Sequence, residues 1–239
     1  MKRIHLILTG LSLTIILLSL NRLTSFTQIT LEPFQFLRWM DLLAMIPIPL
    51  SSVILYFLLK NEIIKDSPFR KTAIYLILNL LLISGIYFFA AGSGTHEFAN
   101  YLHFKFCRSD PSTSLCNIII YNDDRFSHYV YYIGFILMNI ALMFMEFFSP
   151  RKEKISRKDL IFVTLNSLVI AFGIFANLAF EEALLDLFFF GSVMILSLYL
   201  LLKDKKMSLK MPILYYFASS YTIGIVSTII YKLATNTPF

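Results

Sequence analysis

Seven long apolar runs constrain this sequence more than any other feature. They cover residues 4–20, 39–59, 72–92, 127–148, 159–179, 184–202 and 211–231. A helix needs about 20 mostly apolar residues to cross the hydrocarbon core of a bilayer. Inside a bilayer every backbone N–H and C=O must be paired, so runs of this kind cross it as helices. The runs predict an all-α, polytopic membrane protein, with residues 1–239 forming a single domain of seven transmembrane helices.

The composition supports this class. Hydrophobic residues make up 57% of the chain and charged residues 15%, whereas soluble domains have roughly 45–50% and 25%. The net charge is +6, but the basic residues form short clusters between apolar runs and do not line one face, which argues against nucleic-acid binding. We therefore expect the lipid bilayer, and no nucleic acid, as a partner.

The basic residues also predict an orientation. Cytoplasmic segments of membrane proteins are enriched in lysine and arginine. Most of the 21 basic residues fall in alternate segments, at residues 2–3, 60–71, 151–158 and 203–210. This pattern predicts a cytoplasmic N-terminus and an extracytoplasmic C-terminus. We expect a multi-pass protein of a bacterial or archaeal plasma membrane.

The first apolar run has two interpretations. The stretch "MKRIHLILTGLSLTIILLSL" has the charged start and apolar centre of a secretory signal peptide. No small-x-small cleavage motif follows it before "NRLTSFTQ", so we favour an uncleaved first span. Cleavage would leave six spans and keep every remaining loop on its side.

The topology implies one long extracytoplasmic loop, about residues 93–126, which contains both cysteines, Cys107 and Cys116. An oxidising compartment allows these two thiols to pair. The residues between them include "DPST" at 110–113, which favours a turn. We predict a disulfide between the two cysteines.

Three of the four histidines lie in or next to this loop. If the third helix continues past the membrane surface, His96 and His103 share one of its faces, and Asp124 and His128 share a face of the next helix. Imidazoles and carboxylates suit a divalent transition metal, with zinc as the first choice. The predicted metal ligands are His96, His103, Asp124 and His128. Gly92 and Gly94 could instead break the third helix.

Other polar residues on the same side could act at this metal. The candidate general bases for a metal-bound water are Glu97, Asp41 and Asp123, and the candidate oxyanion donors are Ser93 and Ser127. Glu181, Glu182 and Asp186 could join them. Asp41 is the most informative of these residues, because an ionisable group inside a span is costly and usually functional.

Each of these residues also has an ordinary explanation. A histidine at a membrane interface commonly keeps one nitrogen in water, and Asp123 with Asp124 could cap the helix that follows. The clustering of three histidines with acids and amides on one side favours a metal or acid–base site. Asn79, Asn139 and Asn166 fall near the middle of spans, where we expect hydrogen bonds between helices.

The combination of seven spans with histidines, a serine and aspartates near one surface resembles, in residue types, the alkaline ceramidase and adiponectin-receptor superfamily of zinc-dependent membrane hydrolases. That superfamily has a His-x-x-x-His pair in its last helix. Residues 211–231 contain no histidine, so no residue role is carried over from it.

Two functions follow from these observations. The first is a membrane-embedded, metal-dependent hydrolase or lipid-modifying enzyme with a zinc site at the extracytoplasmic face and a lipid or isoprenoid substrate. The alternative is a non-enzymatic small receptor, transporter or assembly factor whose disulfide-pinned outer loop binds a partner. In the second case the histidines would form hydrogen bonds within the loop or sense pH near ~6.5.

Overall fold

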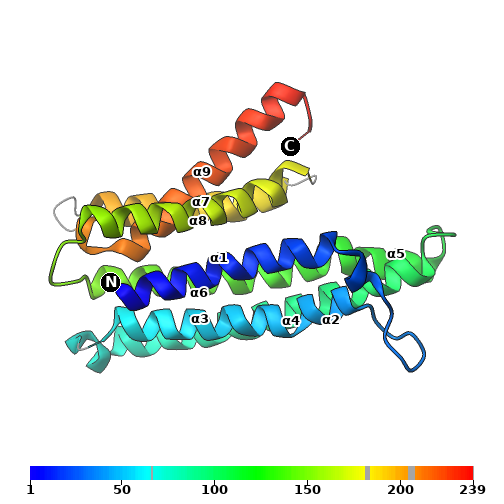
Figure 1. Cartoon of the computed structure of the whole chain (residues 1–239), viewed down its shortest axis with the longest axis horizontal. Coiled ribbons are helices and arrows are strands. Elements are labelled where there is room, and N and C mark those ends of the chain that lie inside the picture. Colours follow the sequence, from blue (N-terminus) through cyan, green and yellow to red (C-terminus); the bar gives the residue numbers. More distant parts are fainter. Residues whose placement is uncertain (66, 181–183, 204–207, 239) are drawn as a thin grey trace. The chain divides into compact units, whose positions relative to one another are not determined.

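The computed structural model describes residues 1–65, 67–180, 184–203 and 208–238, and the described part of the chain is helical apart from turns, short linkers and one isolated bridge (Figure 1). The α-helices are α1 (Lys2–Leu23), α2 (Trp39–Met45), α3 (Pro47–Ile63), α4 (Ala73–Phe106), α5 (Ser114–Tyr121), α6 (Ser127–Phe148), α7 (Arg157–Phe180), α8 (Leu184–Lys203) and α9 (Pro212–Thr235). A π-helical segment, Asn122–Phe126, joins α5 to α6. Glu181, Glu182 and residues 204–207 of the last basic cluster lie outside the described residues.

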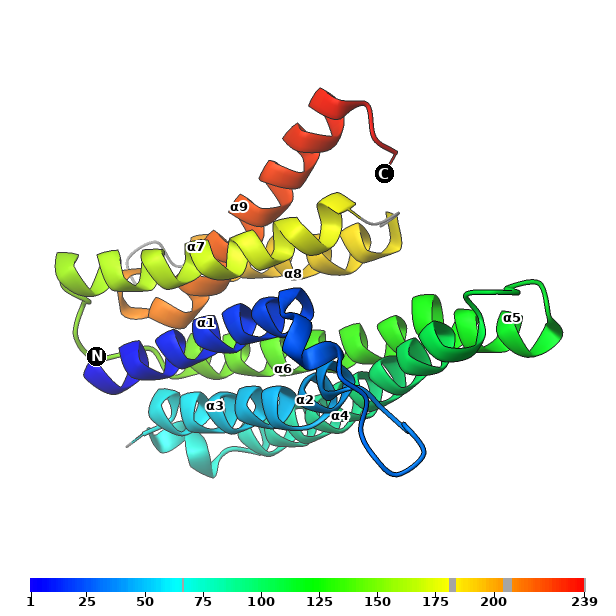
Figure 2. The same ribbon diagram turned by 45° about the vertical axis from the view of Figure 1, so that its right-hand side comes forward.

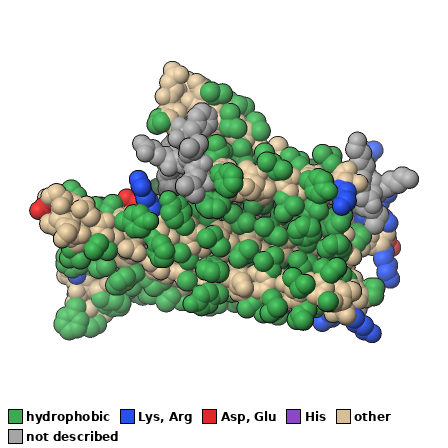
Figure 3. All heavy atoms as spheres, turned by 180° about the vertical axis from the view of Figure 1, so that it is seen from behind, with side chains coloured by type: hydrophobic (Ala, Val, Ile, Leu, Met, Phe, Trp, Pro, Cys, Tyr) green, Lys and Arg blue, Asp and Glu red, His purple; other side chains and the backbone are tan. Residues whose placement is uncertain are grey.

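Seven helical segments of the described chain are long and apolar enough to cross a membrane, which confirms the seven predicted spans. Their bounds are Lys2–Leu23, Trp39–Ile63, Ala73–Phe106, Ser114–Phe148, Arg157–Ala179, Asp186–Lys203 and Pro212–Thr235. Hydrophobic side chains cover most of the face seen in Figure 3, as expected for contact with lipid. The orientation of the spans stays a prediction, as does the single domain.

The segment at residues 93–126 is largely helical, and the third helix continues through it as the shared face of His96 and His103 required. The third span continues without a break to Phe106, and only residues 107–113 separate it from the helical segment that starts at Ser114. Main-chain hydrogen bonds hold a helix together whether its side chains are apolar or polar. The drop in hydropathy after residue 92 therefore marks no helix end.

The predicted disulfide between Cys107 and Cys116 is confirmed, with 5.5 Å between the Cα atoms. Both cysteines are buried together with Ile119, and Leu102 packs against them. The bond ties the end of α4 to the start of α5, so the turn between these two helices is held covalently.

The described chain forms two compact units. The first unit contains Met1–Ile15, Phe57–Leu80 and Asn139–Phe239, and the second contains Ile16–Tyr56 and Leu81–Met138. In the first unit α9 packs against α7 and α8.

The amides expected near the middle of spans form hydrogen bonds in the first unit. Asn166 accepts a hydrogen bond from Ser12 at 2.7 Å, and the amide of Asn139 donates to Tyr221 at 2.6 Å. The Asn79 oxygen accepts from Lys60 at 3.3 Å. Each bond joins two different helices, which confirms the predicted packing role.

A buried carboxylate caps α9 in the first unit. Glu146 of α6 accepts hydrogen bonds from the backbone N–H groups of Ile213 and Leu214, at 3.1 and 2.6 Å. The first N–H groups of a helix have no partner within it, and here a side chain from another helix supplies one. Glu146 is 2% exposed, so water does not replace it.

In the second unit α4 and α6 meet through glycines, and the two helices lie side by side in Figures 1 and 2. A Cβ added at Gly92 would lie 2.3 Å from the backbone nitrogen of Tyr131, and one at Gly134 would lie 2.1 Å from that of Phe89. Contacts this short show that the backbones themselves touch, as small residues allow between membrane helices. Gly92 therefore allows close packing of α4 against α6. The alternative in which it breaks the third helix is wrong.

Candidate functional site

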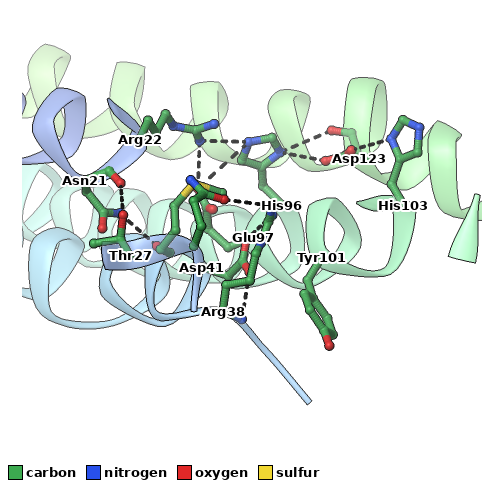
Figure 4. A network of polar contacts seen from close by, with 12 residues as sticks. Asn21, Arg22, Thr27, Arg38, Asp41, His96, Glu97, Tyr101, His103 and Asp123 are labelled. Atoms are coloured by element: carbon green, nitrogen blue, oxygen red, sulfur yellow. Dashed lines mark hydrogen bonds and ion pairs between the residues drawn. The ribbon is translucent and has the colours of Figure 1, made fainter. Parts of the chain in front are cut away.

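A network of polar side chains lies entirely within the second unit (Figure 4). It draws Arg22 from α1, a buried acid from α2, two histidines and a glutamate from α4, and Asp123 from the π-helical segment. The glycine contact between α4 and α6 places the histidines of α4 beside the acids of the π-helical segment that precedes α6. The network thus depends on the close helix packing described above.

The π-helical segment sets the position of Asp123. Single π-turns inside α-helices are rare and occur frequently at functional sites. Here the backbone oxygen of Asp123 accepts a hydrogen bond from Ser127 Oγ at 2.9 Å and lies 3.3 Å from His96 Nδ1. Asp123 and Asp124 lie inside a helical segment, so their expected role as a helix cap is wrong.

One group among the described residues has the composition and spacing of a metal site: His103, Asp123 and Asp124. Each offers a ligand atom, and these atoms lie within 4.8 Å of one another. Two atoms that each lie about 2.0–2.2 Å from one zinc ion are at most about 4.4 Å apart. Small side-chain rotations would therefore be enough to bring the three onto a common ion.

The three residues differ in how far they are exposed, and this decides whether the group is accessible from outside. Asp123 is buried, His103 is half-buried and Asp124 is exposed. The group therefore opens to the surrounding medium on one side. An ion held there would keep a coordination position for water or substrate, as catalytic zinc sites with three protein ligands do.

One carboxylate oxygen of Asp123 is buried without a hydrogen bond among the described residues. Its Oδ2 lies 2.9 Å from His103 Nδ1, whereas its buried Oδ1 has no hydrogen-bond partner among the described residues. Such an oxygen is costly unless a cation or a donor pairs with it. For His103 and Asp123 to bind one ion, His103 Nδ1 would have to give up its proton and its hydrogen bond to Asp123.

His96 lies beside this group but is not part of it. Its Nδ1 is 3.4 Å from Asp123 Oδ1, and its Nε2 is 3.5 Å from an Arg22 nitrogen. An arginine only donates, so Nε2 is the nitrogen that accepts, and Nδ1 carries the proton and donates it to the Asp123 backbone carbonyl 3.3 Å away. His96 is therefore placed to orient Asp123.

The four predicted ligands thus divide into two pairs. The structure brings His103 and Asp124 together with Asp123, which the sequence had suggested as a base. His96 and His128 stand edge to face, with ring centroids 4.7 Å apart, and neither belongs to the three-residue group. The pattern of i, i+4 spacing could not separate the pairs, because the π-turn changes which side chains of α6 face α4.

Glu97 is the acid at the other end of the network. Its Oε1 accepts a hydrogen bond from Arg22 at 2.9 Å, and its buried Oε2 has no hydrogen-bond partner among the described residues. His96 Nε2 lies 4.0 Å from Oε1. The contact between Arg22 and Glu97 was not predicted, because no local spacing links α1 to α4.

Asp41 has a structural role. Arg38 Nη2 and Nε donate to its two carboxylate oxygens, each at 2.8 Å, and both side chains are buried. The Arg38 backbone N–H also donates to Asp41 at 3.0 Å at the start of α2.

The remaining predicted residues differ in their proximity to the metal-capable group. Ser93 donates to the Phe89 carbonyl of its own helix at 2.8 Å. Ser127 lies 3.4 Å from His96 Nδ1 and donates to the Asp123 carbonyl. Asp186 belongs to the first unit.

Comparison with protein-family models, with curated proteins and with solved structures gives no match. The chemistry of the site is therefore argued from its own residues. An imidazole and two carboxylates suit zinc and other divalent transition metals. A metal held by such ligands polarises an oxygen or lowers the pKa of a bound water.

Proposed function

We propose that this chain is a membrane-embedded, metal-dependent hydrolase in which His103, Asp123 and Asp124 hold the metal. The observation that carries the proposal is the meeting of these three side chains at a π-turn, where the buried Oδ1 of Asp123 has no hydrogen-bond partner among the described residues. Zinc is the expected metal, since it accepts nitrogen and oxygen ligands and leaves one position open in catalytic sites.

The surrounding residues have distinct roles in this proposal. His96 orients Asp123, and Ser127 fixes the backbone of the π-turn. Glu97, held by Arg22 and 4.0 Å from His96, is the candidate proton acceptor. The exposed apolar surface of the helices favours a substrate that reaches the site from the bilayer, with a lipid or isoprenoid chain. The basic-residue pattern predicts that the site faces the extracytoplasmic side.

Metal analysis of the purified protein tests the proposed site. The wild type, loaded with zinc and freed of excess, should keep about one ion per chain, and the double variant His103→Ala, Asp123→Ala should keep none, because its ligands are gone. Asp110→Asn is the control, since Asp110 is an exposed acid bonded to Ser112 outside the site. Absence of zinc from a wild type with native helix content would contradict the proposal.

Activity tests the hydrolase. A panel of acyl-ester, amide and phosphoester lipids is incubated with the reconstituted protein, and products are identified by mass spectrometry. Chelation should abolish product formation and added zinc should restore it, because the metal supplies the activated water. Zinc binding without cleavage of any lipid class would contradict the proposed hydrolase activity and support a metal-binding role alone.

One observation favours a second function. The disulfide-tied helix α5 exposes Leu115, Ile118 and Tyr121, spaced three residues apart on one face. A rigid apolar stripe of this kind suits binding of a protein partner by the outer segment. If the wild type binds no zinc, this interpretation replaces the first, and Ile118→Asp should then abolish complex formation in native membranes.

A further inference from the structure

The linker between α1 and α2, residues 24–38, exposes large apolar side chains and projects from the helices of the second unit (Figure 2). Phe34 is 87% exposed and Phe26 66%. Ile29, Phe36 and Trp39 are also exposed. Exposed apolar groups concentrated in one short linker indicate a contact surface.

Main-chain pairing closes the linker into a loop. Thr30 and Arg38 form a bridge, and the Leu31 N–H donates to the Leu37 carbonyl at 2.7 Å. Arg38 is itself fixed by its buried pair with Asp41. The base of the loop is therefore anchored on α2.

Two side chains of α4 hold the tip. Lys105 Nζ donates to the carbonyl oxygens of Phe34 and Gln35 at 3.2 and 2.7 Å, and the Tyr101 hydroxyl donates to the Gln35 carbonyl. Phe34 and Gln35 have positive φ angles of 68° and 51°. Non-glycine residues rarely adopt this conformation, and they keep it where neighbouring groups impose it, often at sites of binding.

The position of the loop between two candidate spans indicates that it contacts the membrane surface. It joins two consecutive candidate membrane spans, Lys2–Leu23 and Trp39–Ile63, so it lies where both reach the membrane surface. Trp side chains are enriched at such a boundary, and Phe side chains of interfacial segments are buried between head groups and acyl chains. A basic residue, Lys105, stands beside the tip and can meet lipid phosphates.

We propose that this loop is a preformed bilayer anchor that places Phe34 and its apolar neighbours in the head-group–acyl boundary of the leaflet where α1 ends and α2 begins. The partner is the lipid bilayer itself. The loop uses none of the metal-capable residues, so the proposal stands independently of the hydrolase.

The single tryptophan of the chain, Trp39, makes the test direct. Trp39→Phe combined with Phe34→Trp moves the only tryptophan to the tip of the loop. The protein is reconstituted in phosphatidylcholine vesicles with or without lipids brominated near the head group. Shallow bromolipid should quench the emission at least about twofold, as for a side chain buried at the interface, and iodide should quench it weakly.

The control is Ser112→Trp in the same Trp39→Phe background, since residue 112 lies in the exposed turn between α4 and α5. Its emission should respond to iodide and little to bromolipid. Iodide-sensitive, bromolipid-insensitive emission from position 34 would overturn the anchor and leave the loop free for a protein partner.

A third variant tests the preformed conformation. Tyr101→Phe, added to the Phe34→Trp, Trp39→Phe protein, removes the hydroxyl that holds Gln35. Bromolipid quenching should fall and iodide quenching should rise while helix content stays the same, because a loosened tip leaves the boundary for part of the time. Unchanged quenching would show that Tyr101 does not hold the loop.

Discussion

Asp123 is the residue on which the proposed chemistry converges, since it meets both histidines of α4 through different oxygens. The sequence predicted that Asp123 lies near the histidines, because only a short stretch of chain separates the end of α4 from the start of α6. Its contact with His103 and the separate place of His128 could not be predicted, because they follow from the π-turn.

At the residue scale, the role of His96 can be separated from that of a ligand. His96→Ala should lower zinc affinity about 10–100-fold without abolishing binding, as expected for a residue that orients a ligand. The dissociation constant is measured by competition with a chromophoric chelator. His128→Ala is the control, because His128 contacts His96 and is not part of the three-residue group. Complete loss of zinc in His96→Ala would make His96 a direct ligand.

The pair Arg38–Asp41 gives a residue-scale prediction about stability. Removing one partner of a buried ion pair leaves an uncompensated charge and costs about 3–5 kcal/mol, whereas removing both costs less. We expect Arg38→Met and Asp41→Leu each to lower the free energy of unfolding more than the double variant does. Titration with dodecyl sulfate, followed by helix content, measures this. Equal or additive losses would contradict the neutralising role of Arg38.

At the scale of elements, the contact between α4 and α6 controls the site. Gly92→Val should push the helices apart and weaken zinc binding, because a Cβ there meets the Tyr131 backbone. Gly94→Val is the matched control: a Cβ there meets nothing within 4 Å. Zinc affinity of both variants is compared in the same detergent. Equal affinities would show that the site tolerates separation of the helices.

The cap of α9 is a second element-scale prediction. Glu146→Ala leaves the first N–H groups of α9 without an acceptor and should cost about 1–3 kcal/mol of unfolding free energy. Glu62→Ala removes a partner of the exposed Arg3, and an exposed ion pair contributes only about 0–1 kcal/mol. The two variants are compared by their unfolding midpoints in dodecyl sulfate. A larger loss in Glu62→Ala would contradict the capping role.

At the scale of the whole molecule, the seven spans could be predicted because backbone pairing in a bilayer allows few alternatives to a helix. The disulfide could be predicted because the chain has two cysteines close together. The sequence left open whether α4 continues past Gly92, since hydropathy reports the bilayer and not the end of a helix. The link between Arg22 and Glu97 depends on packing between distant segments, which no local pattern encodes.

The predicted orientation is also tested at this scale. In a background of Cys107→Ser and Cys116→Ser, Ser112→Cys should react with a membrane-impermeant maleimide added to intact cells. Ser156→Cys, in a segment with many basic residues, should react only after the membrane is opened. Mass shifts on gels report the labelling. The reverse pattern would invert the topology and place the disulfide in the cytoplasm.

The π-turn has a consequence for how this helix can change. Each residue added to or removed from an α-helix turns everything beyond it by about 100°. Deleting one residue from Asn122–Phe126 would therefore rotate Gly134 away from α4 or swing Asp123 away from the histidines. The extra residue of the π-turn sets the rotation between the two parts of the helix. It lets Gly134 face α4 while Asp123 faces the histidines. Length changes within this stretch should consequently be far less tolerated than substitutions.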